Sequence, residues 1–490
     1  MQTAQGLDEF PDASVSRRSL LRSVGMGFPW LALTAVLNRD RSVRGASPSD
    51  GAPPSGQPHF APRAKNVIWL FLPGGYSQME TFDPKPALNQ FAGKTYSDTP
   101  FQDPVKSPHL KRLRSLTGDR RVHPKLLPLQ IGFHKHGESG IEISDWWPRL
   151  SGCVDDMAIV RSMYTTDNEH TAMAQMHSGR HKLDETQPSV GAWVHYGLGS
   201  LNENLPHFIA MGDDPGHDPQ NKQCFQAYYL GPEHAAVHLP IESGNPLPFG
   251  TPGPGILPGE QRNKYALIDR LNKLAALESP DDLELKARIR SYELAFRMQM
   301  SVPSTLDLKT ETPATHKLYG LDNNTTRTAA QFCLTARRMV EQGVRFVHIY
   351  LYGKWDAHDQ LKKVHATDCA QVDQPIAALL TDLKQRGMLD ETLVVCCTEF
   401  GRSPGGQNSG GRDHHPFGFS VWLAGGGIKG GTVHGATDEL GFHAVEDPHY
   451  VTDLHATVLR QLGLDPHELE LPGRKRLEVD FGHPIRAIIS

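Results

Sequence analysis

A continuous apolar run from Asn66 to Leu72, which ends at Pro73-Gly74-Gly75, constrains the fold more than any other segment. A run of this kind predicts a strand buried on both faces, as in the centre of a parallel sheet. Further strands are expected at residues 157–160, 344–350, 392–398 and 419–424. Helices are expected at residues 166–176, 262–278, 282–300, 328–342, 371–386 and 454–462. The alternation predicts an α/β fold with a mostly parallel central sheet and helices on both faces.

The composition along the chain predicts three regions. Residues 1–45 are expected to be a signal region, and residues 46–63, rich in Gly, Pro and Ser, a disordered linker. Residues 64–490 are expected to form a single domain. Within it, residues 205–262 are rich in Pro and Gly and lack periodicity, so they are predicted to be a long insertion near the functional site.

An arginine pair near the N-terminus, Arg17-Arg18, precedes an apolar stretch at residues 24–37. This layout is typical of a twin-arginine signal, and a cytoplasmic N-terminal helix is the alternative. The apolar stretch contains two Gly and one Pro and is too short for a stable membrane span. We therefore expect export by the twin-arginine machinery to the periplasm or the extracellular space. Because that route carries folded proteins, it suits a site whose metal is bound before export.

The overall composition describes an ordinary globular protein of 490 residues with 38% hydrophobic residues and a net charge of -5. No basic run stands out, so nucleic acid is not an expected partner. Six cysteines without a CxxC pattern argue against a framework of disulfides, although an isolated bridge stays open. Cys396 and Cys397 are predicted to be buried strand residues.

Ligand-type side chains gather after two predicted strands and in one glycine-rich loop. An Asp and a His follow strand 344–350, and a Glu follows strand 392–398. The glycine-rich loop at residues 411–416 comes next along the chain. The candidates are Asp356, His358, Glu399, Asp413, His414 and His415. Because parallel strands present their carboxyl ends at one edge of a sheet, these groups are expected to converge. They suit one or two divalent ions such as Zn, Mn or Ca, and solvated turn residues are the alternative.

A segment rich in hydroxyl and polar groups, residues 165–171, follows the predicted strand at 157–160 and opens a predicted helix with Asp167 as its N-cap. The N-terminus of a helix favours an anion and can lower the pKa of a nucleophile. Thr166 and Thr171 are therefore candidate nucleophiles, and His170 is a candidate ligand or base. Simple capping of the helix is the alternative.

Arg402 follows Glu399 by three residues. A guanidinium group there would suit an anionic substrate oxygen, which it could bind through two hydrogen bonds. A structural pair between Arg402 and Glu399 explains the same spacing equally well.

Taken together, these motifs resemble the exported family called domain of unknown function 1501. The resemblance covers residues 64 to the end, and its motifs lie at residues 72–77, 81–85, 188–193, 353–358, 398–404, 411–416 and 453–457. That family more distantly resembles the alkaline phosphatase and sulfatase superfamily. The resemblance implies an alkaline phosphatase-like α/β fold with a site for one or two metals.

By order along the chain, the resemblance assigns Asp356 and His358 to one metal and puts Glu399 near the strand-end Asp of a second metal. It likewise puts residues 413–415 near the last histidine of the superfamily site. One departure stands out, because Pro73-Gly74-Gly75 occupies the place of the usual metal-binding Asp after the first strand. No Cys-x-Pro-x-Arg motif occurs either, which disfavours a formylglycine sulfatase.

The expected function is an exported, metal-dependent hydrolase of a phosphate or sulfate ester. Its substrate would be a small, glycan or lipid ester, with metals polarising the ester and Arg402 stabilising the charge of the transition state. The alternative is a non-catalytic exported binding protein that keeps the fold and a structural metal. The missing carboxylate after the first strand favours this alternative, and the late Asp-His-His cluster favours the enzyme.

Overall fold

The protein is described by a computed structural model for residues 56–101, 106, 122–202, 204–212, 221–241, 258–278, 289, 305–351, 353, 355–471 and 473–490. The chain divides into two units, and the larger covers residues 46–246 and 300–490. The smaller covers residues 1–45 and 247–299, of which the structure describes helix α8 (Pro258–Glu278). The predicted signal region and, apart from residue 289, the predicted helix at 282–300 lie outside the described residues.

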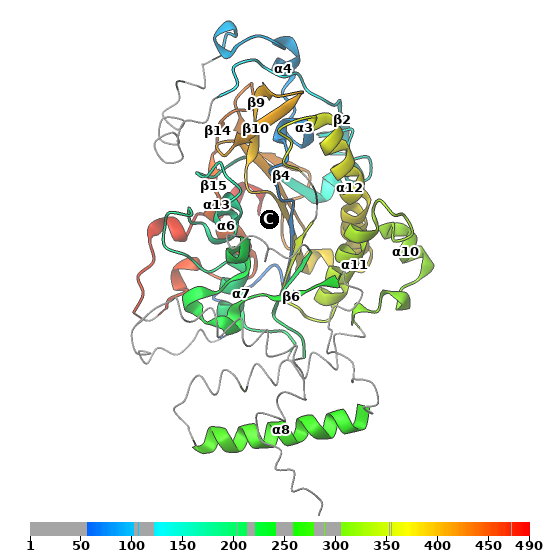
Figure 1. Ribbon diagram of the computed structural model, residues 1–490, viewed down its shortest axis with the longest axis vertical. Helices are drawn as coiled ribbons and strands as arrows, with labels where there is room; N and C mark the ends of the chain where they lie inside the picture. Colours follow the sequence, from blue (N-terminus) through cyan, green and yellow to red (C-terminus); the bar gives the residue numbers. More distant parts are fainter. Residues whose placement is uncertain are drawn as a thin grey trace, which may run out of the picture. The chain divides into compact units, whose positions relative to one another are not determined.

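A nine-stranded sheet forms the centre of the larger unit (Figure 1). Its order is β12-β4-β11-β8-β1-β7-β5-β6, and β15 also pairs with β4. The strands are β1 (Asn66–Phe71), β4 (Met157–Tyr164), β5 (Phe208–Gly212), β6 (Val237–Leu239), β7 (Phe346–Tyr350), β8 (Thr392–Cys397), β11 (Phe419–Ala424), β12 (Thr432–His434) and β15 (His449–Tyr450). Only β11 within this sheet pairs antiparallel with its neighbours. The prediction of a mostly parallel α/β sheet is confirmed.

The central strand β1 is fully buried, as its apolar sequence predicts. It pairs in parallel with β7 on one side and β8 on the other, with Leu70 opposite Ile349 and Cys396. The three strands therefore end at one edge of the sheet. The segments that follow them, with Gly74, Asp356 and Glu399, start from that common edge.

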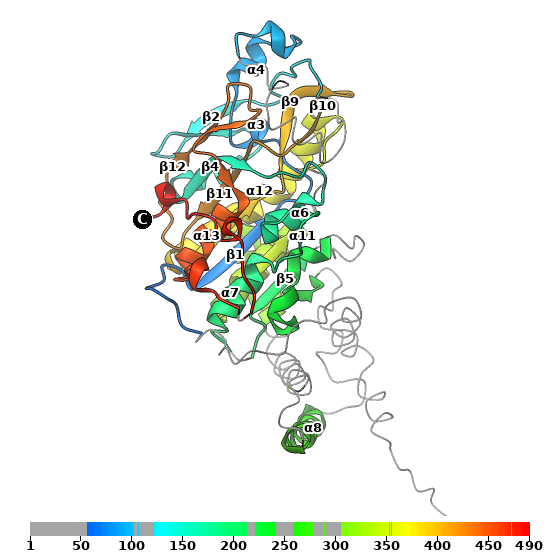
Figure 2. The same cartoon turned by 90° about the vertical axis from the view of Figure 1, so that its left-hand side faces the viewer.

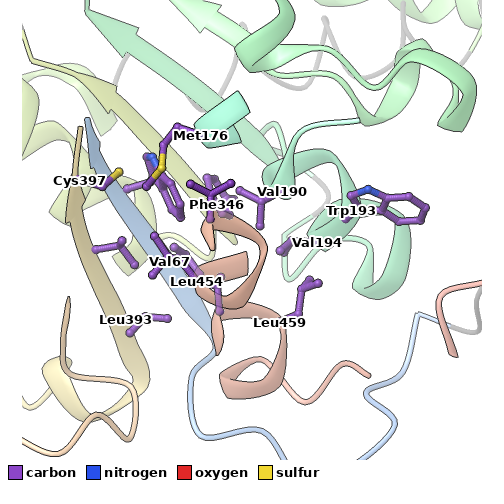
Figure 3. Packing of buried hydrophobic residues seen from close by; sticks show 14 of the residues in the cluster. Val67, Met176, Val190, Trp193, Val194, Phe346, Leu393, Cys397, Leu454 and Leu459 are labelled. Carbon is purple, nitrogen blue, oxygen red and sulfur yellow. The ribbon is translucent and has the colours of Figure 1, made fainter. Parts of the chain in front are cut away.

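Helices cover both faces of the sheet (Figure 1). On one face lie α6 (Ala172–Ser178), α7 (Val190–Leu198) and α13 (Val451–Gln461), and on the other α11 (Arg327–Glu341) and α12 (Leu361–Gln385). Alternate residues of β1 point to one face, so Val67, Trp69 and Phe71 join the core under the first group. Figure 3 shows Val67 in this core with side chains of α6, α7 and α13.

Shorter elements surround one end of the sheet. They are α3 (Gln78–Thr81), α4 (Pro86–Gln90), β2 (Phe133–His136), β3 (Ile141–Ser144), β9 (Gly401–Gln407), β10 (Gly411–His415), β13 (Ala436–Thr437) and β14 (Ala444–Glu446), whereas α10 (Pro313–Tyr319) packs against α12 and α11. Strands β9 and β10 form a separate antiparallel hairpin that contacts α3 (Figure 2). The segment predicted to be a glycine-rich loop is thus an ordered strand. Its glycines permit close approach, since a Cβ at Gly411 would lie 2.0 Å from the carbonyl carbon of His358.

The segment after β4 differs from its prediction. The helix expected from residue 166 begins only at Ala172, and residues 166–171 form an irregular turn. Asp167 is therefore not an N-cap of α6. Its buried carboxylate accepts hydrogen bonds from the N–H of Glu169 at 3.0 Å and from the hydroxyl of Thr171. These local bonds hold the turn in place of a first helical turn.

Two other expectations are wrong in part. The predicted insertion at 205–262 contains β5 and β6, which extend the central sheet at its edge. Short strands in a Pro- and Gly-rich region give too little periodicity to predict. In the predicted linker, residues 46–55 lie outside the described residues, but His59 and Arg63 donate backbone hydrogen bonds at 2.8 Å to Gly463 and Gln461.

All six cysteines are free and buried, including Cys396 and Cys397 in β8, so the isolated bridge that the sequence left open is not formed. Among the helices that the structure describes, none has the length and apolar character to cross a membrane.

Candidate metal centre

The carboxylate of Asp356, just past the end of β7, is the centre of the candidate site. Its Oδ1 lies 2.8 Å from Nε2 of His414 and 3.0 Å from Nε2 of His358. Its Oδ2 lies 3.2 Å from Nε2 of His170. Ligand atoms of His170, Asp356 and His414 all lie within 4.8 Å of one another. The nitrogen atoms of His358 and His414 that face Asp356 are 3.0 Å apart.

In all three histidines, the other ring nitrogen is held by an oxygen of the protein. The contacts are His170 to Glu399 at 3.1 Å, His414 to the carbonyl of Asn168 at 2.7 Å, and His358 to Gln407 at 2.7 Å. Carboxylate and carbonyl oxygens only accept hydrogen bonds, so Nδ1 of each ring donates to them. This leaves Nε2 of each ring toward Asp356. Histidine ligands of metals are commonly oriented in this way.

The separations between the donor atoms match a common ion. Metal–ligand distances of about 2.0–2.2 Å in tetrahedral geometry put neighbouring donors roughly 3.3–3.6 Å apart. The observed separations from Asp356 to the three histidines, 2.8 to 3.2 Å, are slightly shorter, so an ion would need only a small outward shift of the rings. The residues present therefore fit a divalent ion by donor type, and His170, Asp356 and His414 also by their mutual closeness.

The electrostatics of the centre depend on the two carboxylates around His170. Burial lowers the pKa of His170, but its hydrogen bonds to Asp356 and Glu399 outweigh burial and raise this pKa to about 10. Burial also raises the pKa of Asp356, but the three histidines and Arg402 hold it well below its usual range. Asp356 is therefore ionised, and a proton on His170 balances its charge. Binding of a metal would displace that proton.

His414 and His415 are adjacent in β10, but the structure separates them. His414 is opposite Arg402 and His415 opposite Gly401 in the hairpin, which has an irregularity between residues 412 and 414. Because side chains alternate along a strand, His414 points to Asp356 and His415 to the opposite face. The ring of His415 packs against Phe442, with centroids 4.0 Å apart. Of these two predicted ligands, only His414 contacts Asp356.

Glu399, predicted to be a ligand, is fully buried behind His170. It accepts hydrogen bonds from the N–H of Gly74 at 2.8 Å and from the hydroxyl of Thr398 at 3.0 Å, in addition to its contact with His170. These partners surround its carboxylate. Its place is that of a residue that orients His170, which replaces the expectation of a direct ligand.

Arg402, predicted to bind substrate, is fully buried and bonded to the protein. Its donors reach the carbonyl of Gly75 at 2.7 Å, Arg412 at 3.0 Å, Trp355 at 3.1 Å and also Gly74. A further bond of 2.8 Å reaches Oδ1 of Asp356. The structural pair with Glu399 is not formed, since Arg402 pairs with Asp356 instead. Its donors are engaged in fixing Asp356 and the turn after β1.

The turn after β1 carries glycines at the place where the sequence resemblance implies a metal-binding Asp. Gly74 has φ +112°, and a Cβ there would lie 2.7 Å from the backbone nitrogen of Asp356. Gly75 has φ +77°, and a Cβ there would lie 2.3 Å from the ring of Phe400. The two glycines allow the backbone itself to pack against the site. The backbone of this turn supplies a donor to Glu399 and acceptors to Arg402, in place of a side-chain carboxylate.

Asp413 lies at the outer side of the centre. Its Oδ1 is 3.6 Å from Nδ1 of His358, and its Oδ2 is 3.9 Å from Nε2 of His123. It also accepts a hydrogen bond of 2.9 Å from the backbone N–H of His414. Asp413 thus contacts the nitrogen of His358 that faces away from Asp356.

The two candidate nucleophiles are both engaged with neighbouring side chains. The hydroxyl of Thr166 accepts a hydrogen bond of 2.7 Å from Gln175, which also donates to Tyr450 at 2.6 Å. The hydroxyl of Thr171 donates to Asp167. Thr166, His170 and Thr171 lie in the same turn, and it is His170 that contacts Asp356.

Two participants could not be found from the sequence. Asn168 acts through its backbone carbonyl, which every residue has, so its identity carries no signal. Gln407 lies in a Gly-rich segment, where an amide is typical of a turn. The tautomers of His414 and His358 are therefore set by groups that only the folded chain brings to them.

Fold and site together define a mixed α/β protein with a partly exposed histidine–aspartate centre at the carboxyl edge of its sheet. The chain belongs to the family "Protein of unknown function (DUF1501)", whose profile matches residues 64–489. This confirms the family resemblance that the sequence motifs carry. No curated protein sequence matches the chain at a significant level.

Among solved structures, the chain is similar to the phosphonate monoester hydrolase SpPMH from Silicibacter pomeroyi, with 12% identity, 86% of this chain and 76% of that chain covered, and a TM-score of 0.37. The lipoteichoic acid synthase LtaP from Listeria monocytogenes gives 9% identity, 88% and 80% coverage, and a TM-score of 0.33. The alkaline phosphatase from the Antarctic bacterium TAB5 gives 9%, 81% and 98%, and 0.31.

Proposed function

We propose that this protein is an exported hydrolase that binds a divalent metal at Asp356 and cleaves a phosphate or sulfate ester. The observation that carries the proposal is the convergence of three Nε2 atoms on one carboxylate. A structural ion-pair cluster would not need all three rings to be fixed by acceptors on their far nitrogens. A metal site does need this, because each ring must present a lone pair to the ion.

The donor set favours some metals over others. His170, His358 and His414 would supply nitrogen and Asp356 would supply oxygen to the ion. Such a set suits Zn or Mn better than Ca, which prefers oxygen ligands only. A bound ion would supply Lewis-acid polarisation of an ester oxygen. His170, Asp356 and His414 are mutually close and support one ion, and His358 lies beside Asp356 and His414, while Asp413 and Glu399 lie outside the set.

The exposure of the residues supports access for a substrate from one side. The side chains of His170 and Asp356 are 36% and 37% exposed, whereas Glu399 behind them is 0% exposed. The centre is therefore backed by buried groups and open at His170 and Asp356. Glu399 would hold the proton on Nδ1 of His170, and Arg402 would hold the carboxylate of Asp356 in place during a reaction.

A non-catalytic binding protein with a structural metal is the second candidate. It is favoured by Arg402, because the donors of this guanidinium group are bonded to protein oxygens. They are therefore not available to stabilise the negative charge of a transition state. The engaged hydroxyls of Thr166 and Thr171 favour it as well. Both candidate functions include a bound metal, and they differ in whether the protein turns over an ester substrate.

The first experiment measures metal content and turnover together. Purified protein is analysed for bound metal, in parallel with His414→Ala and with the control His134→Ala, which alters a histidine that is 69% exposed. The proposal expects His414→Ala to hold about one ion per chain fewer than the parent and the control, which is the ion of the Asp356 centre. Absence of metal from the parent protein after loading with Zn or Mn contradicts both candidates. Bound metal without turnover of phosphate or sulfate esters supports the binding protein.

The nucleophile is tested separately with Thr166→Ala and Thr171→Ala. If either hydroxyl is the nucleophile, its variant loses turnover by several orders of magnitude and keeps its metal. Loss of metal in Thr171→Ala would instead assign Thr171 to the turn that holds His170, through its bond to Asp167.

Export is the last part of the proposal. Free, buried cysteines are compatible with folding in a reducing compartment before transport, because the fold needs no disulfide there. Cell fractionation of the parent and of a variant with Arg17→Lys and Arg18→Lys tests the twin-arginine route. We expect the parent outside the cytoplasm and the variant inside it. Equal distribution of the two would contradict this route.

A further inference from the structure

Two histidines that play no part in the Asp356 centre face each other along one edge of the sheet. Nε2 of His434 lies 2.9 Å from Nε2 of His449, and their ring centroids are 5.2 Å apart. His434 is opposite Val160 and His449 opposite Met163, because β12 and β15 both pair in parallel with β4. The chain leaves this edge after His434 and returns to it at His449. The two imidazoles therefore meet at the base of that excursion.

Asp453, in the first turn of α13, determines the tautomer of His449. Its Oδ2 lies 2.9 Å from Nδ1 of His449, and the other oxygen accepts the backbone N–H of His483 at 2.8 Å. Since a carboxylate only accepts, Nδ1 of His449 carries the hydrogen and Nε2 has its lone pair toward His434. This is the same relationship that Glu399 has with His170. It is the common arrangement behind a metal-binding histidine.

The surroundings of the pair provide access and negative charge. The side chain of His449 is 17% exposed, and that of Asp453 is 14% exposed. Glu446 and Asp447, both exposed, are the acidic neighbours that act electrostatically on His434. An ion can thus reach the pair from solvent, and the local carboxylates favour a cation.

We propose that His434 and His449 form a second divalent metal site, distinct from the Asp356 centre, with solvent completing the coordination. Two neutral imidazoles suit Zn²⁺, Ni²⁺ or Cu²⁺ and not Ca²⁺ or Mg²⁺. An ion bound by both rings would cross-link β12 to β15 and fix the two ends of the segment at residues 435–448. That segment carries Phe442, whose ring packs on His415 beside the ligand His414. The second ion would thereby stabilise the support of the first centre. The site does not depend on the proposed hydrolase function.

The test uses the full chain after removal of metals, titrated calorimetrically with Zn²⁺. The parent is compared with His434→Ala, with Asp453→Asn, and with His414→Ala, which alters the first centre only. We expect His434→Ala to lose one equivalent of Zn²⁺ that His414→Ala retains. Asp453→Asn should weaken the same equivalent about 10–100-fold, the usual effect of losing a partner behind a ligand.

Other outcomes decide against the site. If His434→Ala binds as many equivalents as the parent at micromolar Zn²⁺, the pair is only an N–H···N hydrogen bond and the proposal is wrong. If His434→Ala does not fold, His449→Gln replaces it, and an unchanged stoichiometry in that variant is equally decisive. If the first centre binds no metal, the parent and His414→Ala should still bind the one equivalent that His434→Ala loses. The two proposals can therefore fail separately.

Discussion

Nδ1 of His170 lies 3.1 Å from the buried carboxylate of Glu399, while Nε2 of the same ring lies 3.2 Å from Asp356. One imidazole thus joins a fully buried carboxylate to a half-exposed one. The buried partner keeps a hydrogen on Nδ1, so an ion that binds beside Asp356 would displace the proton from Nε2. The properties of the centre therefore depend on a residue that is not expected to touch the metal.

Replacement of Glu399 by Gln tests this dependence. The amide keeps the shape but loses the charge that holds the hydrogen on Nδ1 of His170, so metal affinity should fall about 10–100-fold. The affinity is measured by competition with a chromogenic chelator. Glu391→Gln serves as a control, because Glu391 is exposed and pairs with Lys65. An unchanged affinity in Glu399→Gln would show that His170 is oriented by other contacts.

The glycine turn after β1 gives a second prediction. In Gly74→Ala, a methyl group would lie 2.7 Å from the backbone nitrogen of Asp356, and the backbone there has φ +112°. Because backbone cannot move aside as a side chain can, Asp356 should shift and metal binding should be lost. Unfolding should also be easier by a few kcal/mol, from the positive φ and the clash.

The matched control is Gly140→Ala, which has φ +66° and no heavy atom within 4 Å of the added methyl group. It should lose only about 1–2 kcal/mol from the positive φ and keep its metal. Both variants are compared by chemical denaturation and by metal analysis. Full metal content in Gly74→Ala would mean that the turn does not set the place of Asp356.

Arg402→Lys separates a structural role of this arginine from a role in substrate binding. Lysine cannot reach the carbonyls and the carboxylate that the guanidinium joins, so the free energy of unfolding should fall by about 3–5 kcal/mol. Arg386→Lys is the control, since Arg386 is 35% exposed and its pair with Asp382 should contribute less than about 1 kcal/mol. Denaturation curves of the variants without metal provide the measurement. A normally stable Arg402→Lys that binds metal but lacks turnover would restore the substrate role.

Buried histidines of the core predict loss of stability in acid. Burial is the first cause that lowers the pKa of His177 to about 3 and that of His455 to about 4. In the unfolded chain these groups have a pKa near 6.5, so below that pH the unfolded state binds more protons than the folded state. Their contribution to stability is complete above about pH 6.5 and is lost as the pH falls toward 3–4. Between about pH 6.5 and 5, each histidine should remove about 2 kcal/mol.

His177→Phe tests this pH dependence. The ring of His177 packs with its centroid 4.7 Å from that of Phe71, so phenylalanine keeps the packing and removes the titrating group. The variant should lose less stability than the parent when urea denaturation is repeated from pH 7 to pH 5. The control His134→Phe introduces the same residue at a histidine that is 69% exposed, outside the core. An identical slope in parent and His177→Phe would mean that this histidine is not buried neutral.

The layers of the fold follow from the residue pattern. The apolar run at β1 and the runs at β7 and β8 are buried over their whole length, and their composition permits little else. Their alternation with amphipathic helices then requires a mostly parallel sheet, which puts the carboxyl ends of the strands at one edge. For this reason Asp356 and His414 could be named as neighbours although they are far apart in the chain.

The role of each candidate residue depends on its partners in the folded chain. Alternation along β10 sends His414 to Asp356 and His415 to Phe442, and the sequence shows two equal histidines. Glu399 is buried and orients His170, and Arg402 is buried with its donors bonded to backbone carbonyls. A group that is enclosed by backbone partners cannot also face a substrate. Residue type determines which chemistry a side chain can perform. Its partners in three dimensions determine whether that chemistry remains available, and those partners are largely backbone atoms that carry no sequence signal.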